Sequence, residues 1–87
     1  MSVVTPIEQL LHRIRWDRAF GQGRFEIGYL DRAEGRICRV ALQELVFPKD
    51  QRNVFELVDE SGVYRRIPFH RIRRVWRDGQ LIWQRPG

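Results

Sequence analysis

The sequence predicts an α+β fold, in which an N-terminal helix packs on a curled antiparallel sheet of five or six strands. An apolar stripe with helical spacing occupies residues 6–15, and the later segments are short, strand-like and separated by turns. No second segment is long enough for the helical crossover that a parallel sheet requires. A small, partly open β-barrel is the alternative, because a strongly turned sheet often curls.

The helix is expected at residues 6–15. Its apolar residues recur at i, i+3, i+4 and i+7 and form one stripe: Ile7, Leu10, Leu11 and Ile14. Thr5-Pro6-Ile7-Glu8 has the pattern of a capping box with proline at the first helical position. His12 falls on the opposite, solvated face of this helix.

Two β-hairpins are expected next. Residues 24–31 alternate, with Phe25, Ile27 and Tyr29 on one face, and residues 36–42 return as the partner strand after a turn at 33–35. A short helical turn at 43–45 precedes the second hairpin, which pairs residues 54–58 with residues 63–67. Pro68 ends that hairpin, because proline cannot donate to a neighbouring strand.

A third hairpin is expected around Asp78-Gly79, between residues 75–77 and 80–83. A two-residue type I′ turn needs positive φ at both central positions, which Asp tolerates and Gly adopts freely. The hairpin makes Trp76 and Leu81 cross-strand neighbours and places Trp83 under the helix.

The connector at residues 68–71 is expected to be a tight connection or a single helical turn. It would turn Phe69 and Ile72 inward, and His70 and Arg71 outward. Positive neighbours favour the neutral imidazole of His70, which can donate one hydrogen bond and accept another.

Length and composition predict one domain covering residues 1–87. A hydrophobic content of 43% and a charged content of 31% are typical of globular proteins. The single cysteine, Cys38, excludes an internal disulfide and fits a reducing compartment. No apolar run approaches the roughly 20 residues of a membrane span, and no signal peptide is evident, so a cytoplasmic protein without a membrane partner is expected.

Positive charge is concentrated in the last quarter of the chain. Residues 65–87 hold seven arginines and one acidic residue, whereas residues 1–64 hold nine basic and ten acidic residues. Fifteen of the sixteen basic residues are arginine, which suits phosphate and base contacts, although arginine-rich codon usage explains that excess equally well. The clustering after residue 64 is more informative and predicts an anionic partner.

Several kinds of active site are not supported by the sequence. One cysteine and two distant histidines form no metal-ligand cluster. The glycines form no phosphate-cradling loop before a helix, so no cofactor is expected. His12 is better explained as a dipole partner near the end of its helix, and no catalytic set is complete.

Four short segments resemble a known family: Arg15-Trp16-Asp17, Tyr29-Leu30-Asp31-Arg32, Ile67-Pro68-Phe69-His70-Arg71-Ile72 and Trp83-Gln84-Arg85. They are similar to a small family of archaeal and bacterial proteins described as the RNA repair, or RNA cyclic-group end recognition, domain. The resemblance covers nearly the whole chain, and Ile-Pro-x-His-Arg-Ile is its most specific part. Arg18 departs from the family pattern, which has proline or another small residue after the Trp-Asp pair.

The resemblance implies binding of RNA ends, notably 2′,3′-cyclic phosphates, beside RNA-processing enzymes. Carried over by position, it implicates His70 and Arg71 first, Arg32 and Asp31 second, and Trp16 with Asp17 third.

We therefore expect a non-catalytic module that recognises a phosphate-bearing RNA end in RNA repair or processing. Arg71, Arg32 and Arg65 would donate to phosphate oxygens, His70 would bridge phosphate and a sugar oxygen, and Trp16 would stack the terminal base. Two alternatives stay open. One is a phosphodiesterase or ribonuclease that uses His70 as general acid–base, and the other is a protein-interaction module with a basic face.

Overall fold

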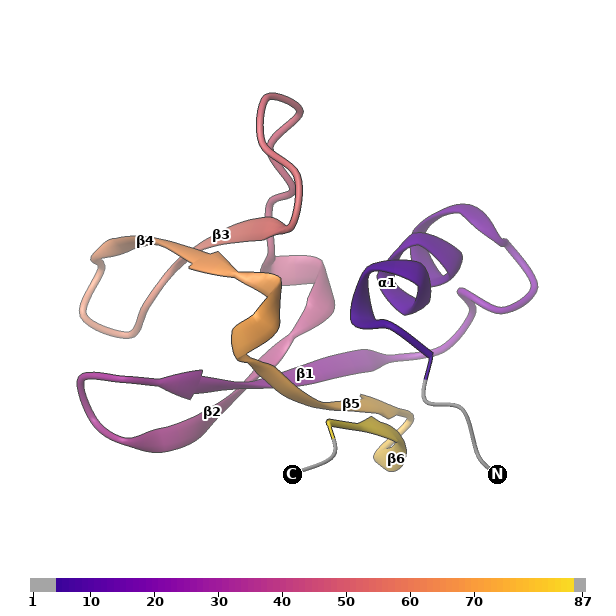
Figure 1. Ribbon diagram of the computed structural model, residues 1–87. Helices are drawn as coiled ribbons and strands as arrows, with labels where there is room; N and C mark the ends of the chain where they lie inside the picture. Colours follow the sequence, from indigo (N-terminus) through magenta and orange to yellow (C-terminus); the bar gives the residue numbers. More distant parts are fainter. Residues whose placement is uncertain (1–4, 86–87) are drawn as a thin grey trace.

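The computed structural model describes residues 5–85, which form one helix, six strands and two 3-10 turns (Figure 1). In chain order these are α1 (Ile7–Trp16), β1 (Phe25–Asp31), β2 (Arg36–Ala41), η1 (Leu42–Glu44), β3 (Val54–Val58), β4 (Tyr64–Pro68), η2 (Phe69–Arg71), β5 (Ile72–Arg77) and β6 (Gln80–Gln84). The predicted α+β class, the three hairpins and the helical turn before β5 are confirmed. The alternative of a β-barrel is not confirmed, since the described strands do not form a closed sheet.

The strands divide into two antiparallel sheets rather than the one expected sheet. A four-stranded sheet has the order β2-β1-β5-β6, and β3 pairs with β4 in a separate hairpin. The hairpin and α1 lie on the same side of the larger sheet (Figure 1). The hairpin is joined to the larger sheet by η1 and a loop on one side and directly by η2 on the other.

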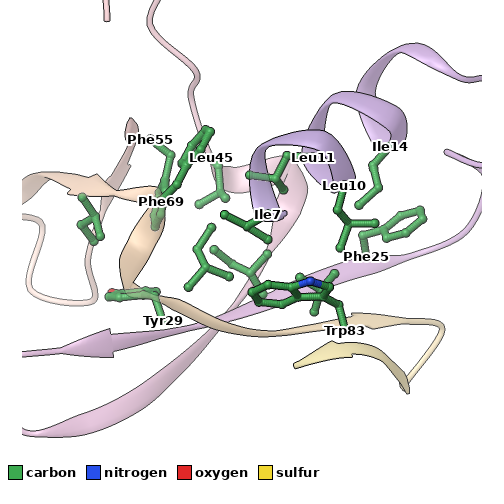
Figure 2. Packing of buried hydrophobic residues seen from close by; sticks show 14 of the residues in the cluster. Ile7, Leu10, Leu11, Ile14, Phe25, Tyr29, Leu45, Phe55, Phe69 and Trp83 are labelled. Carbon is green, nitrogen blue, oxygen red and sulfur yellow. The ribbon is translucent and has the colours of Figure 1, made fainter. Parts of the chain in front are cut away.

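The hydrophobic core lies between α1, the β3–β4 hairpin and the larger sheet (Figure 2). The apolar stripe of α1 is buried as predicted, and so are Phe25, Ile27 and Tyr29 of β1. The largest fully buried side chains come from all three parts: Leu11, Ile27, Phe55, Ile72 and Val75.

The predicted capping box at the start of α1 is wrong. Pro6 occupies the N-cap position in an extended conformation, and no side chain caps the helix. The carbonyl oxygen of Pro6 accepts hydrogen bonds from the backbone N–H groups of Gln9 and Leu10 at 3.0 and 3.1 Å. The helix therefore begins at Ile7, one residue later than predicted.

The turn between β5 and β6 has the predicted geometry, with φ of 51° at Asp78 and 82° at Gly79. Asp78 Oδ1 also accepts a 2.8 Å hydrogen bond from the backbone N–H of Arg24, which fixes the turn against the start of β1. Trp76 and Leu81 are paired as expected, but a bulge at Ile82 shifts the rest of the register by one residue.

Within residues 5–85, no helix is long and apolar enough to cross a bilayer.

Candidate functional site

A pocket of about 350 Å³ lies between the end of β1 and the strand–turn segment β4–η2. Four of its lining residues are arginines that come from three elements: Arg32 in the turn after β1, Arg65 and Arg66 in β4, and Arg71 in η2. We call it the arginine pocket. Its size is within the range of about 300–1,000 Å³ that is usual for small-ligand sites.

Two of these arginines are held by carboxylates. Arg65 Nε donates to Asp59 Oδ2 at 2.7 Å, and Arg65 Nη1 lies 3.8 Å from Asp31 Oδ2. Arg66 makes 2.8 and 2.6 Å contacts with Glu56 Oε2 through Nε and Nη2. Hydrogen bonding to Asp59 raises the pKa of Arg65 above its usual value. Arg65 and Arg66 are therefore held in place by carboxylates that also offset their positive charge.

The other two arginines have no carboxylate partner among residues 5–85. Neither Arg32 nor Arg71 forms an ion pair or a side-chain hydrogen bond with a described residue. Arg71 Nε is buried and lacks a hydrogen-bond partner. A buried charged donor without an acceptor is unfavourable, and no described carboxylate neutralises the Arg71 guanidinium.

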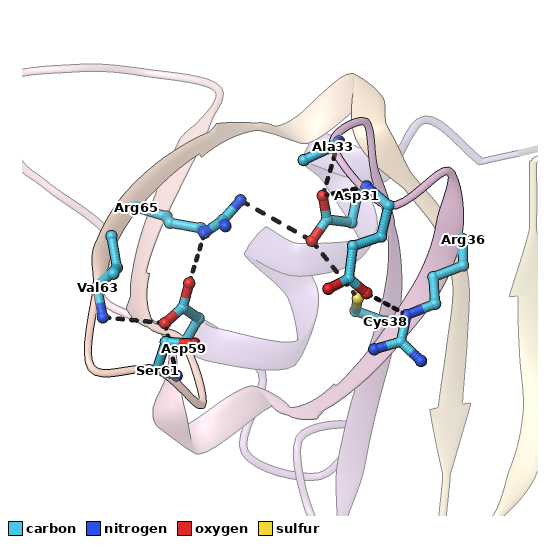
Figure 3. A network of polar contacts seen from close by, with 9 residues as sticks. Asp31, Ala33, Arg36, Cys38, Asp59, Ser61, Val63 and Arg65 are labelled. Atoms are coloured by element: carbon cyan, nitrogen blue, oxygen red, sulfur yellow. Dashed lines mark hydrogen bonds and ion pairs between the residues drawn. The ribbon is translucent and has the colours of Figure 1, made fainter.

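Asp31 organises the turn that carries Arg32 (Figure 3). It is only 8% exposed. Its Oδ1 accepts hydrogen bonds from the backbone N–H groups of Ala33 at 2.9 Å and Glu34 at 3.3 Å, and Oδ2 faces Arg65 and the thiol of Cys38. Asp31 thus lines the arginine pocket as a structural acceptor that positions Arg32 and Arg65.

Asp59 anchors the opposite side of this network (Figure 3). Its Oδ1 accepts hydrogen bonds of 2.9 Å from the backbone N–H groups of Ser61 and Val63, and its Oδ2 accepts from Arg65. The bond from Val63, followed by that from Arg65, lowers the pKa of Asp59 below its usual value. The β3–β4 turn and Arg65 are therefore fixed together.

His70 lines a different pocket from its neighbour Arg71. As predicted, His70 is exposed, but it faces a space of about 260 Å³ shared with Arg85, Trp83 and the start of α1. Successive side chains of a 3-10 helix point about 120° apart, because the helix has three residues per turn. The structure therefore brings Arg71, Arg32, Arg65 and Asp31 together, and leaves His70 outside this group.

Trp16 and Asp17 lie at the end of α1 and do not line the arginine pocket. Trp16 is 66% exposed, as expected. Asp17 Oδ1 accepts 3.1 Å hydrogen bonds from the backbone N–H groups of Ala19 and Phe20, so Asp17 stabilises the turn after the helix.

Two residues that shape the candidate site were not among the residues predicted from the sequence. Arg66 lines the arginine pocket, and its place opposite Glu56 in the β3–β4 hairpin is the signal that could have identified it. Arg85 was cited only as part of the resemblance. It donates through Nε to the carbonyl oxygen of Ile72 at 2.9 Å and through Nη2 to that of Phe69 at 3.4 Å, so it fixes both ends of η2.

No three His, Cys, Asp or Glu side chains of the described part of the chain gather closely enough to hold a metal ion. The site is instead defined by guanidinium groups, whose planar forks match the oxygens of phosphate or carboxylate groups.

The fold and the pocket define a small α+β protein with a surface pocket lined by four arginines. The chain belongs to the MJ1316 RNA cyclic group end recognition domain family, whose model matches residues 4–85. No curated protein and no solved structure matches it.

Proposed function

We propose that the protein is a non-catalytic RNA-binding module that holds a phosphate-bearing RNA end, such as a 2′,3′-cyclic phosphate, in the arginine pocket. Arg32 and Arg71 donate to the phosphate oxygens, while Arg65 and Arg66, held by carboxylates, form the fixed wall beside them. The observation that carries the proposal is the lining of the pocket. Two of its arginines are bound by carboxylates, and the other two have no carboxylate partner among the described residues.

The family's description, which names RNA cyclic group end recognition, supports RNA as the ligand. The concentration of arginine in the last quarter of the chain supports phosphate as the recognised group. A cytoplasmic location, a role in RNA repair or processing, and an RNA-processing enzyme as partner belong to the same proposal.

His70 is not part of end recognition in this proposal, because it lines the pocket beside Arg85 and Trp83. The enzyme alternative requires His70 at the phosphate, whereas the present proposal assigns that position to Arg71. Incubating the wild type with a cyclic-phosphate oligonucleotide distinguishes the two. The proposal expects no turnover, and turnover that His70→Ala abolishes would replace it with the enzyme.

Titrations with three RNAs test the proposal directly. The RNAs share one sequence and end in a 2′,3′-cyclic phosphate, a 3′-phosphate or a 3′-hydroxyl. We expect the phosphate-bearing ends to bind more tightly than the hydroxyl end. If three or four phosphates of a single strand are contacted, log affinity falls with log salt at a slope of roughly −2 to −3.

Matched arginine variants locate the site. Arg71→Ala and Arg32→Ala should each weaken binding of the phosphate-bearing ends and flatten the salt slope by about 0.7 per lost contact. Arg18→Ala removes the same charge from an exposed residue that does not line the arginine pocket, and should leave end preference unchanged. Equal affinity for all three ends, or an equal effect of Arg18→Ala, would contradict the proposal.

A further inference from the structure

A second basic pocket lies on the other side of η2, between α1 and the loop that precedes β3. It has a volume of about 430 Å³. His12 and Arg15 line it from α1, and Phe47, Lys49 and Arg52 line it from the loop. We call it the helix pocket. Its three permanent cations face one lining acidic residue, Glu8, and none of the three forms an ion pair with a described residue.

An exposed tryptophan stands at the rim of this pocket. The guanidinium of Arg15 lies 4.3 Å from the ring centre of Phe47 and 5.6 Å from that of Trp16. The imidazole of His12 lies 6.3 Å from the Trp16 ring, centre to centre. Trp16 is 66% exposed, more than any other large hydrophobic side chain described. The indole therefore offers a stacking surface next to a cationic pocket.

The loop that carries Lys49 and Arg52 is fixed at both ends. Val46 forms an antiparallel bridge with Glu56, and the carbonyl oxygen of Asn53 accepts a 2.7 Å hydrogen bond from the backbone N–H of Phe69. The cations of the helix pocket are thus presented from an anchored loop, which lowers the ordering cost of binding.

The two basic pockets are physically connected. Arg66 lines the arginine pocket and donates through Nη1 to Gln51 Oε1 at 3.0 Å, and Gln51 lines the helix pocket. Phe69, the first residue of η2, lines the helix pocket, and Arg71, the last, lines the arginine pocket. The Arg66–Gln51 hydrogen bond therefore joins a lining residue of the arginine pocket to a lining residue of the helix pocket.

We propose that the helix pocket binds the body of the single-stranded RNA whose end occupies the arginine pocket. Arg15, Lys49 and Arg52 contact the backbone phosphates, and a base stacks on Trp16. A positively charged groove beside an exposed aromatic ring is the arrangement that binds single strands with little sequence preference. The placement of the RNA end rests on the proposed function, whereas the contact with the RNA body does not.

RNA length provides the test. A dinucleotide ending in a 2′,3′-cyclic phosphate is compared with a ten-nucleotide RNA that carries the same end. We expect Trp16→Ala to weaken the longer RNA by about fivefold or more, as the loss of a base–aromatic stack does, and to change the dinucleotide less than twofold. Trp16→Phe should restore most of the loss, because every aromatic ring offers a stacking face. The double variant Lys49→Ala/Arg52→Ala should weaken the longer RNA and flatten its salt slope.

Arg18→Ala is the control, since Arg18 is exposed just beyond α1 and lines neither pocket. An equal loss on both RNAs would overturn the inference, because the helix pocket would then contact the end itself. Unchanged binding of the longer RNA would also overturn it, and would favour a protein partner for this surface. If the dinucleotide fails to bind while a ten-nucleotide RNA with a 3′-hydroxyl still depends on Trp16 and Arg52, the end-recognition proposal fails and this inference stands.

Discussion

The indole Nε1 of Trp83 donates a 2.7 Å hydrogen bond to the carbonyl oxygen of Thr5, which lies 78 positions earlier in the sequence. The bond joins β6 to the segment just before α1, and the buried Trp83 ring packs under the helix (Figure 2). The two ends of the described chain are therefore fixed to each other beside the pocket that His70 lines.

Trp83→Phe should lower the free energy of unfolding by about 1–3 kcal/mol, because the smaller ring leaves a void and the Thr5 carbonyl loses its donor. Urea unfolding measures the change. Trp16→Phe is the matched control, since Trp16 is exposed, and it should stay within about 0.5 kcal/mol of the wild type. Equal losses for the two variants would show that Trp83 does not join the two ends of the fold.

Leu11→Ala should cost about 2–5 kcal/mol, because Leu11 is 2% exposed in the centre of the core. His12→Ala, on the exposed face of the same helix, should cost no more than about 0.5 kcal/mol. Thermal melts of the two variants check the ranking. A reversed order would mean that the packed face of α1 has been assigned wrongly.

Gly28→Ala should destabilise the larger sheet by about 1–3 kcal/mol, the usual effect of overpacking. A Cβ atom at Gly28 would lie 2.8 Å from Ile37 Cγ2 and 2.9 Å from Trp76 Cη2, so both side chains must shift. Adding Ile37→Ala should recover part of the loss, because it removes one of the two clashes. Wild-type stability of Gly28→Ala alone would contradict the predicted close packing.

Much of the fold was predictable from local patterns. The spacing of Ile7, Leu10, Leu11 and Ile14 places α1 within one residue of its observed bounds, and Asp78-Gly79 fixes the last hairpin. The division into two sheets was not predictable, because the alternation in β3 and β4 is the same in either arrangement. Tertiary contacts decide how the strands divide. Val46 forms an antiparallel bridge with Glu56, and Phe55 packs against Tyr29 and Phe69.

The candidate site was predictable in composition more than in geometry. Clustering of arginine after residue 64 pointed to β4 and η2, and the resemblance added Arg32. Arg71 and His70 line different pockets because a 3-10 turn rotates their side chains apart. The sequence did not decide between such a helical turn and a tight connection. That Asp31 serves as a turn acceptor depends on hydrogen bonds to Ala33 and Glu34, which a motif does not reveal.

Asp59→Asn should lower the free energy of unfolding at neutral pH, and this difference from the wild type should disappear in acid. The folded state lowers the pKa of Asp59 below its ordinary value of 3.8, first through Val63 N–H and then through Arg65. A lowered folded-state pKa stabilises the protein above the unfolded-state pKa, and the contribution disappears as pH falls through the folded-state value. The gap in unfolding free energy between wild type and variant should therefore be constant from pH 7 to 5 and shrink below about pH 3.8.

Urea unfolding at pH 7, 5, 3 and 2 measures this gap. Asp50→Asn changes an exposed carboxylate in the loop before β3 and is expected to stay within about 0.5 kcal/mol of the wild type at neutral pH. A gap for Asp59→Asn that widens in acid would show that the ion pair with Arg65 is not what stabilises this turn.

Arg85→Lys should weaken RNA binding, although Arg85 itself is not expected to contact the RNA. Arg85 holds the carbonyl oxygens of Phe69 and Ile72, which flank His70 and Arg71, and lysine keeps the charge but cannot span both acceptors. Losing about 0.5–1.5 kcal/mol of hydrogen bonding lets η2 loosen and should reduce affinity for a phosphate-bearing RNA end about twofold to tenfold. Because Arg85 does not line the arginine pocket, the salt slope should match that of the wild type for Arg85→Lys and also for Arg85→Ala, which removes the charge, whereas Arg71→Ala flattens it. Titrations at three salt concentrations measure both quantities. A slope for Arg85→Ala that falls as far as that for Arg71→Ala would show that Arg85 contacts phosphate directly, and the pocket shared by Arg85 and His70 would then become part of the RNA surface.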